Sequence, residues 1–102
     1  MFIGNVADTF EIKGRGVEVA IDRTVDQLPK ELRIYVGDPV EFRSAGAALF
    51  QTTISGIGFC DPPNPHRPFA FLVMAAKTDV PIGAEVWSLR APGARTVETA
   101  KG

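Results

Sequence analysis

Residues 8–22 read DTFEIKGRGVEVAID, and this stretch decides the fold. Phe10 and Ile12 alternate with polar residues before Gly14, Arg15 and Gly16, and a second alternation of valine and isoleucine follows. A period of two indicates strands with one buried face. Glycine adopts positive φ at little cost, as a tight reversal between strands requires. The stretch therefore predicts a β-hairpin that carries Arg15, solvated, at its tip.

Further short runs of β-branched and aromatic residues follow, separated by glycine and proline turn signals. No window of twelve or more residues keeps a 3.6-residue period without glycine or proline, and Pro29 limits residues 25–34 to a helical turn. Six or seven short strands predict a closed or sandwiched all-β domain over residues 1–90, followed by a flexible tail at 91–102. The expected strands are residues 2–12, 17–23, 32–36, 40–43, 50–59, 69–76 and 84–89, with connections at 24–31 and 44–49.

The alternation also predicts which side chains face the core. In the first segment, Phe2, Val6, Phe10 and Ile12 fit one face. The acidic residues of the strands are expected on the wet face. These are Asp8, Glu11, Glu18, Asp22, Glu41 and Glu85. Tyr35 and Trp87 lie in strand patterns with apolar neighbours, which favours packing over stacking on a nucleobase.

Two segments break the regular pattern. Gly56 and Gly58 lie inside a β-rich run and predict a bulge or a close backbone approach. Residues 61–68, DPPNPHRP, contain four prolines and cannot pair as a central strand.

Composition narrows the classes of partner. The 102 residues contain 11 Lys plus Arg and 12 Asp plus Glu, a net charge of −1, which argues against strong binding to nucleic acid or an anionic membrane. The single cysteine excludes an intramolecular disulfide and favours a cytoplasmic protein. The N-terminus has no basic region before a long apolar run, so no signal peptide is expected, and no run is long enough to cross a bilayer.

Cys60, Asp61 and His66 are the one grouping of chemically reactive residue types. Cysteine and histidine could form a nucleophile and its base, and the three together could ligate zinc. The chain has no second cysteine or histidine, and the spacing matches no metal motif. We therefore interpret Cys60 as a strand-end residue and His66 as a surface residue, and we expect no catalytic residue, metal or cofactor.

Four residues are candidates for contact with a partner: Arg15, His66, Arg67 and Phe69. A guanidinium offers paired donors to a phosphate or carboxylate, although Arg15 also fits a simple polar turn. Prolines lower the entropy cost of holding one loop shape, so the proline-rich loop could display His66, Arg67 and Phe69 rigidly. The alternative is a stiff connection between strands.

The opening motif resembles the second domain of translational GTPases of the elongation factor Tu type. In that family a strand ending in Phe-x-Ile leads through Gly-Arg-Gly into alternating valines. Further matches follow in the same order: VGDPVEF at 36–42, TTISGIGF at 52–59 and FAFLVMAAKTDVPIGAEV at 69–86. The resemblance spans roughly residues 2–89 and implies a stand-alone six-stranded antiparallel β-barrel with Greek-key elements.

The resemblance also bears on function. The phosphate-binding pattern Gly-x-x-x-x-Gly-Lys-Ser/Thr does not occur in the chain, so GTPase activity is not implied. The family's glutamate for the aminoacylated end of tRNA corresponds to Gly58 here, so that binding is not implied either. A non-enzymatic binding or adaptor module for a protein or ribonucleoprotein is the function expected. An RNA- or nucleotide-binding barrel is the alternative, and a small Cys/His enzyme ranks last. Self-association through strand edges is a further option.

Overall fold

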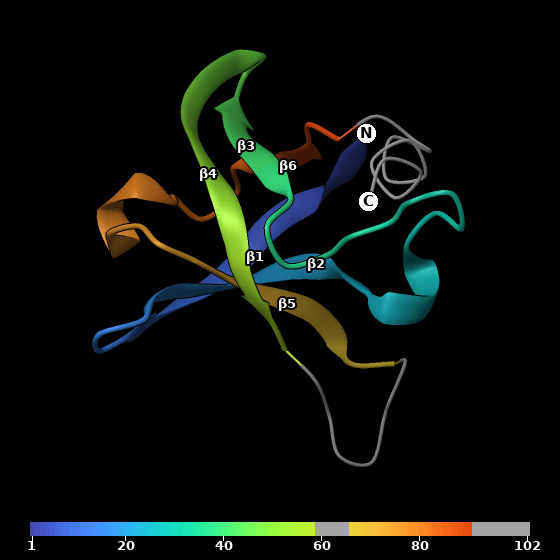
Figure 1. The fold of residues 1–102 in the computed structure, drawn as a ribbon. Helices are drawn as coiled ribbons and strands as arrows, with labels where there is room; N and C mark the ends of the chain where they lie inside the picture. The colour runs from blue at the N-terminus through green and yellow to red at the C-terminus, as the bar shows by residue number, and fades with distance from the viewer. Residues whose placement is uncertain (59–65, 91–102) are drawn as a thin grey trace, which may run out of the picture.

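The computed structural model describes residues 1–58 and 66–90 (Figure 1). Within these residues the chain forms strands and two short 3₁₀ helices. The strands are β1 (Phe2–Ile12), β2 (Gly16–Thr24), β3 (Pro39–Ser44), β4 (Ala47–Ile57), β5 (Pro68–Val73) and β6 (Glu85–Ser88). The 3₁₀ helices are η1 (Val25–Gln27) and η2 (Lys77–Asp79). The predicted helical turn is therefore present as η1, which ends before Pro29. None of the described helices is long and apolar enough to span a membrane.

Each strand is antiparallel to both of its neighbours. The strand order is β1-β2-β5-β4-β3-β6, and β6 returns to pair with β1, so the described strands form a closed ring. This arrangement confirms the prediction of an all-β fold with six antiparallel strands. Each described strand has a neighbour on both sides, although β6 pairs only with the first residues of β1 and β5 only with the last residues of β4.

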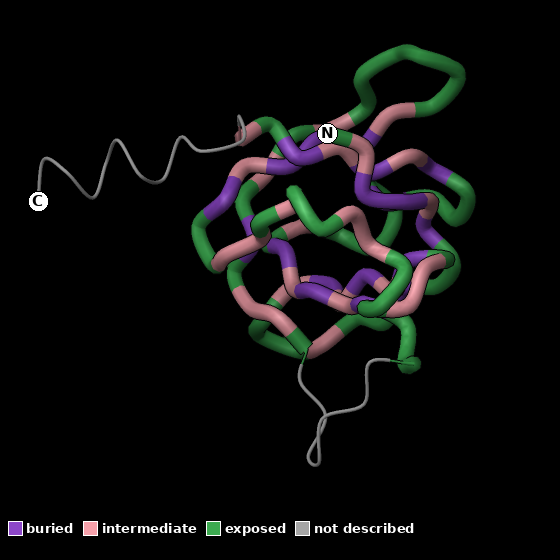
Figure 2. The backbone as a smooth tube through the Cα atoms, turned by 90° about the vertical axis from the view of Figure 1, so that its right-hand side faces the viewer, coloured by how far each residue is buried: buried purple, intermediate pink, exposed green. Residues whose placement is uncertain are grey.

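The apolar core fills the inside of the ring. In β2, Val17, Val19 and Ile21 are buried as the alternation predicted. In Figure 2, buried positions alternate with partly exposed ones along the chain. Each fully buried valine, isoleucine or phenylalanine contributes roughly 1.5–3 kcal/mol to folding. The other buried hydrophobic residues are Ile3, Val6, Val40, Phe42, Ile54, Phe69, Phe71, Val73, Val80, Ala84 and Val86.

The β1–β2 hairpin forms where the sequence predicted it. Gly14 and Gly16 have φ angles of 77° and 98°, in the left-handed region that favours glycine. The Arg15 N–H donates to the Ile12 carbonyl at 2.9 Å, which closes the turn. Arg15 is exposed at the tip, as expected.

The predicted core face of β1 is partly wrong. Phe10 is 50% exposed and Phe2 is only partly buried, whereas Ile3 is fully buried. The pairing of β1 shifts register twice, between Phe2 and Gly4 against β6 and between Val6 and Asp8 against β2. Each irregularity changes which residues face inward, because the side-chain period of a strand is two.

The predicted strand at residues 32–36 does not form. Both neighbours of β3 in the ring are already taken, by β4 and β6, so no free edge remains for another strand. Leu32 and Ile34 are instead partly buried and pack against the core. Their alternation therefore reflects burial without strand pairing.

The predicted connection at residues 44–49 is mostly strand. Ser44 pairs with Ala47, and only Ala45 and Gly46 form the turn, with φ angles of 52° and 81°. Two consecutive positive φ values are typical of the two-residue turns that join antiparallel strands. The resulting β3–β4 hairpin is exposed at its tip and projects at the top of Figures 1 and 2.

A buried ion pair joins the start of β3 to the residues after β6. The Asp38 side chain is 2% exposed, and its Oδ1 accepts from Arg90 Nε at 2.7 Å. Its Oδ2 accepts from the Tyr35 N–H at 2.8 Å. Tyr35 thus lies in a turn, and its predicted place in a strand is wrong. The predicted tail at 91–102 lies outside the described residues.

Candidate functional site

A shallow hollow lies on the outside of the ring, between the β1–β2 turn and strands β4 and β5. Its volume is about 440 Å³, and we call it the β4–β5 groove. The lining residues are Gly14, Arg15, Ser55, Gly56, Ile57, Leu72 and Met74. Arg15, which the sequence identified as a candidate, therefore belongs to a concave surface that the sequence did not predict.

Two glycines create this groove. A Cβ on Gly16 would lie 2.2 Å from the Val73 carbonyl oxygen, so only glycine lets the hairpin turn come this close to β5. A Cβ on Gly56 would lie 3.0 Å from Leu72 Cδ1. The pairing of β4 with β5 shifts register between Ile54 and Gly56, which confirms the predicted irregularity. The missing side chain at Gly56 leaves room above β4.

Exposed apolar side chains lie in and beside the groove. In register across the outside of the sheet, Phe10 pairs with Glu18, Glu18 with Leu72, and Leu72 with Gly56. Phe10 is 50% exposed and Met74 is 60% exposed. Side chains that leave so much apolar area in water gain free energy when a partner covers them.

One basic side chain, Arg15, and one acidic side chain, Glu18, lie at this surface. The Arg15 side chain makes no ion pair or hydrogen bond within residues 1–58 and 66–90. The Glu18 carboxylate extends toward β4, with Oε2 3.6 Å from where a Cβ on Gly58 would lie. It too has no ion-pair partner among the described side chains. The two charges are therefore available to groups outside this part of the molecule.

His66 and Arg67 lie at the opposite end of the same sheet. His66 Nδ1 is 3.3 Å from Asp26 Oδ2, and the Arg67 carbonyl accepts from the Val25 N–H at 3.3 Å. The hydrogen bond from the Thr24 hydroxyl, together with His66, holds the pKa of Asp26 below its usual value.

These residues are remote from Arg15 because β2 separates them. The chain pairs Thr24 with Pro68 at one end of β2, whereas Arg15 precedes Gly16 at the other. Eight residue steps along a strand correspond to about 26 Å. The structure does not bring Arg15 together with His66 and Arg67 into one site.

Phe69 corrects a further expectation. Its ring is 7% exposed and lies 5.8 Å from the Phe71 ring, centroid to centroid. Phe69 follows Pro68 inside β5 and points into the core, so it is not displayed to a partner. Cys60 and Asp61 lie outside the described residues.

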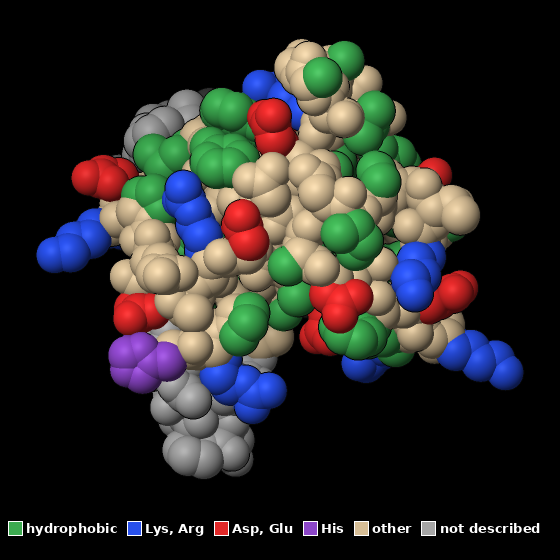
Figure 3. All heavy atoms as spheres, turned by 180° about the vertical axis from the view of Figure 1, so that it is seen from behind, with side chains coloured by type: hydrophobic (Ala, Val, Ile, Leu, Met, Phe, Trp, Pro, Cys, Tyr) green, Lys and Arg blue, Asp and Glu red, His purple; other side chains and the backbone are tan. Residues whose placement is uncertain are grey.

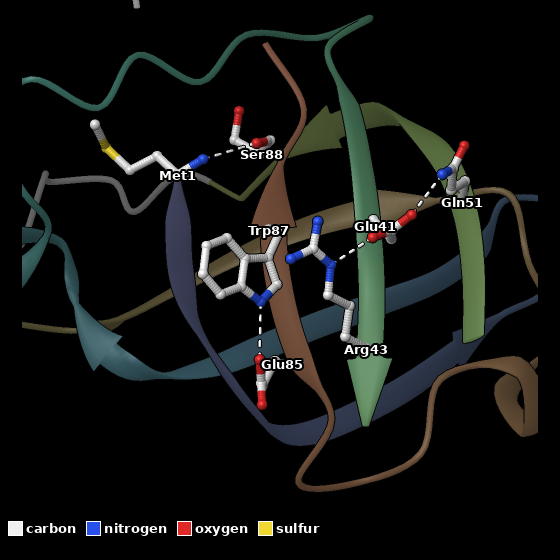
Figure 4. Close-up of polar contacts among 7 residues, drawn as sticks. All are labelled: Met1, Glu41, Arg43, Gln51, Glu85, Trp87 and Ser88. Atoms are coloured by element: carbon white, nitrogen blue, oxygen red, sulfur yellow. Dashed lines mark hydrogen bonds and ion pairs between the residues drawn. The ribbon is translucent and has the colours of Figure 1, made fainter. Parts of the chain in front are cut away.

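A second polar cluster lies on β3, β4 and β6 (Figure 4). Glu41 is only 6% exposed, so the expectation that water surrounds this side chain is wrong. Its carboxylate accepts from Gln51 Nε2 and forms an ion pair with Arg43. Glu41 does point away from the core, as the alternation requires, but side chains from the adjacent strands cover it. That cover depends on strand neighbours distant in sequence, which the local pattern does not report.

Trp87 belongs to the same surface. Its ring centroid lies 5.3 Å from that of Phe2 and 4.5 Å from the Arg43 guanidinium carbon. Its Nε1 donates to Glu85 at 2.9 Å, as Figure 4 shows. These contacts confirm that Trp87 packs within the molecule, with its polar edge satisfied.

Acid is expected to weaken the fold through Glu41. Hydrogen bonds from Gln51 and then Arg43 hold the pKa of Glu41 below its usual value of 4.5. A lowered folded-state pKa stabilises the protein above the unfolded-state pKa, and this contribution is lost as pH falls through the folded value. Glu41→Gln should therefore flatten the loss of stability below about pH 4.5. Urea unfolding midpoints between pH 7 and pH 3 measure this slope.

The matched control is Glu11→Gln, an exposed glutamate on β1. It should leave the acid slope closer to that of the natural chain. A Glu41→Gln variant with the same pH profile as the natural chain would show that the contacts in Figure 4 do not couple to stability.

The groove offers chemistry for binding. Its described lining contains one charged side chain, Arg15, with Glu18 beside it. The described residues contain no group of three or more His, Cys, Asp or Glu side chains placed to hold a metal ion. No protein-family model, curated protein or solved structure matches the chain.

Proposed function

We propose that the chain is a non-enzymatic binding module that contacts a partner protein through the β4–β5 groove. One observation carries this proposal: an exposed apolar surface adjoins Arg15, whose guanidinium has no ion-pair partner among the described residues. The pairings of β1 with β2, β2 with β5 and β5 with β4 hold this surface in one shape. A rigid surface loses little conformational entropy when a partner binds.

The sequence resemblance supports the architectural side of the proposal. We interpret the closed ring as a Greek-key β-barrel of the translation-factor second-domain type. In support, β5 inserts between β2 and β4, and β6 between β3 and β1, so strands distant in sequence are neighbours in space. A barrel of this kind is suited to act as an adaptor.

Charge favours a protein partner over RNA. Acidic and basic side chains are interspersed on the face shown in Figure 3. The whole chain carries a net charge of −1, whereas RNA binding through the phosphate backbone draws on a basic excess. Two arginines do stack on aromatic rings, Arg23 on Phe2 and Arg43 on Trp87, but those rings already pack on each other.

Met74→Asp should abolish most partner capture. Met74 is exposed at the groove, so the substitution should leave folding intact while placing a charge where an apolar contact forms. Burying a methionine contributes about 1.5–3 kcal/mol, which corresponds to a roughly ten- to hundredfold change in affinity. Affinity capture from host lysate with quantitative mass spectrometry of the retained proteins measures the loss.

The matched control is Ile82→Asp, which alters another exposed apolar residue away from the groove lining. It should retain the proteins that Met74→Asp loses. Equal capture by both variants and the natural chain would contradict the proposal. Capture that ribonuclease abolishes and that falls steeply with salt would favour the RNA-binding alternative.

A further inference from the structure

The β4–β5 groove has Arg15 in its lining, and the Glu18 carboxylate lies beside it, outside the lining. Arg15 lies beside Met74, which follows β5. Glu18 extends toward Gly58, whose N–H donates to the Ala70 carbonyl at 2.9 Å. The apolar Leu72 lies between these two charged groups. A ligand that fits this surface therefore presents a negative group, an apolar group and a positive group in line.

The length of the groove sets the spacing of these groups. Met74, directly after β5, lies four residues from Ala70, which corresponds to about 13 Å of extended chain. The same length of extended ligand peptide contains three or four residue steps. An acid and a base separated by three or four residues can thus reach Arg15 and Glu18 at once.

The backbone of the groove excludes one mode of peptide binding. Across the groove β4 is paired with β5, at Gly56 with Leu72 and at Ile57 with Phe71, and β5 is paired with β2, so a ligand lying over this face cannot insert between them as a further strand. Binding has to rely on the side chains of the ligand. This requirement makes the charge pattern the main source of specificity.

The size of the surface favours a short segment over a second copy of this chain. Four neighbouring strands and four residue steps cover roughly 14 Å by 13 Å, on the order of 200 Å². A stable dimer buries about 800 Å² on each partner. The surface is therefore large enough for one or two apolar side chains with flanking charges.

We infer that the groove binds an extended segment of a partner protein that carries an acidic residue for Arg15, an apolar residue over Leu72 and Met74, and a basic residue for Glu18. The acidic and basic residues of that segment lie three or four positions apart. This inference rests on the proposed protein-binding function and adds the chemistry of the partner.

A displayed library of random twelve-residue peptides tests the inference on the full chain. The natural chain should enrich peptides with one acidic and one basic residue three or four positions apart around an apolar residue. The Arg15→Glu variant should enrich peptides in which a second basic residue replaces the acidic one. The Glu18→Arg variant should enrich peptides in which a second acidic residue replaces the basic one. An individual selected peptide should bind Arg15→Glu roughly three- to tenfold more weakly, since an exposed ion pair is replaced by repulsion.

The outcomes separate this inference from the proposed function. Both charge variants must unfold at the same temperature as the natural chain, which their exposed or partly exposed positions predict. Enrichment of apolar peptides that Met74→Asp abolishes, with no charge preference, would overturn the inference and leave the proposed function standing. No enrichment by the natural chain, together with dimerisation in analytical ultracentrifugation that Met74→Asp abolishes, would overturn it in favour of a second copy.

Discussion

Gly16→Ala is expected to destabilise the fold by about 3 kcal/mol or more, the combined effect of a left-handed backbone and a steric clash. Gly16 has a φ of 98°, and its Cβ would lie 2.2 Å from the Val73 carbonyl oxygen. A backbone oxygen inside a paired strand cannot move away as a flexible side chain can. The hairpin turn must therefore separate from β5, and the pairing of Val17 with Val73 is disrupted first. Urea unfolding followed by Trp87 fluorescence measures the loss.

Gly14→Ala is the matched control in the same turn. Gly14 has a φ of 77°, but a Cβ there would meet no atom within 4 Å. Its cost should be limited to the left-handed conformation, about 1–2 kcal/mol. Equal costs for the two variants would show that the turn does not press against β5 as described. The comparison also tests the groove, because the contact of Gly16 with Val73 places Arg15 beside Met74.

Asp38→Ala should cost about 3–5 kcal/mol, because one partner of a buried ion pair is removed. The Asp38 carboxylate is 2% exposed and accepts from both Arg90 Nε and the Tyr35 N–H. The Asp38 carboxylate thus connects the turn before β3 to Arg90. Next to this contact, the Leu89 N–H donates to the Pro39 carbonyl. Removing the carboxylate takes away the acceptor that the Arg90 side chain and the Tyr35 N–H share at a position that is almost fully buried. Urea unfolding at pH 7 gives the free energy directly.

Two further variants serve as comparisons for Asp38→Ala. Asp38→Asn keeps an acceptor for Tyr35 but removes the charge, so its stability should fall between those of the natural chain and Asp38→Ala. Asp26→Ala removes a carboxylate that pairs with His66 on the surface and should have little effect. A loss for Asp38→Ala no larger than that for Asp26→Ala would contradict the argument from burial.

The β1–β2 hairpin was the most predictable part of the fold. Its alternation and its two glycines act between residues close in sequence, and the structure contains the turn where they placed it. Strands β2 and β5 and their core residues followed for the same reason. The predicted strand at 32–36 failed because its alternation records burial alone, and pairing depended on whether β3 had a free side.

The candidate site was predictable only in part. Arg15 was identified as a partner-contact residue from its place in the turn, but nothing local placed it beside Leu72 and Met74. Phe69 was wrongly expected on the surface, because a position next to a proline-rich loop does not show whether the strand has already begun. Glu41 was wrongly expected in water, because its cover comes from Arg43 and from Gln51 on another strand.

The local pattern of the amino-acid sequence thus determined the class of the fold, the position of the hairpin and the identity of most core residues. These depend on side-chain period and backbone preference, which act over a few residues. The ring order, the register shifts in β1 and β4 and the composition of the groove were decided only by tertiary structure. They depend on which strand has a free neighbour and on how closely two backbones approach, and these are relations between segments far apart in the sequence.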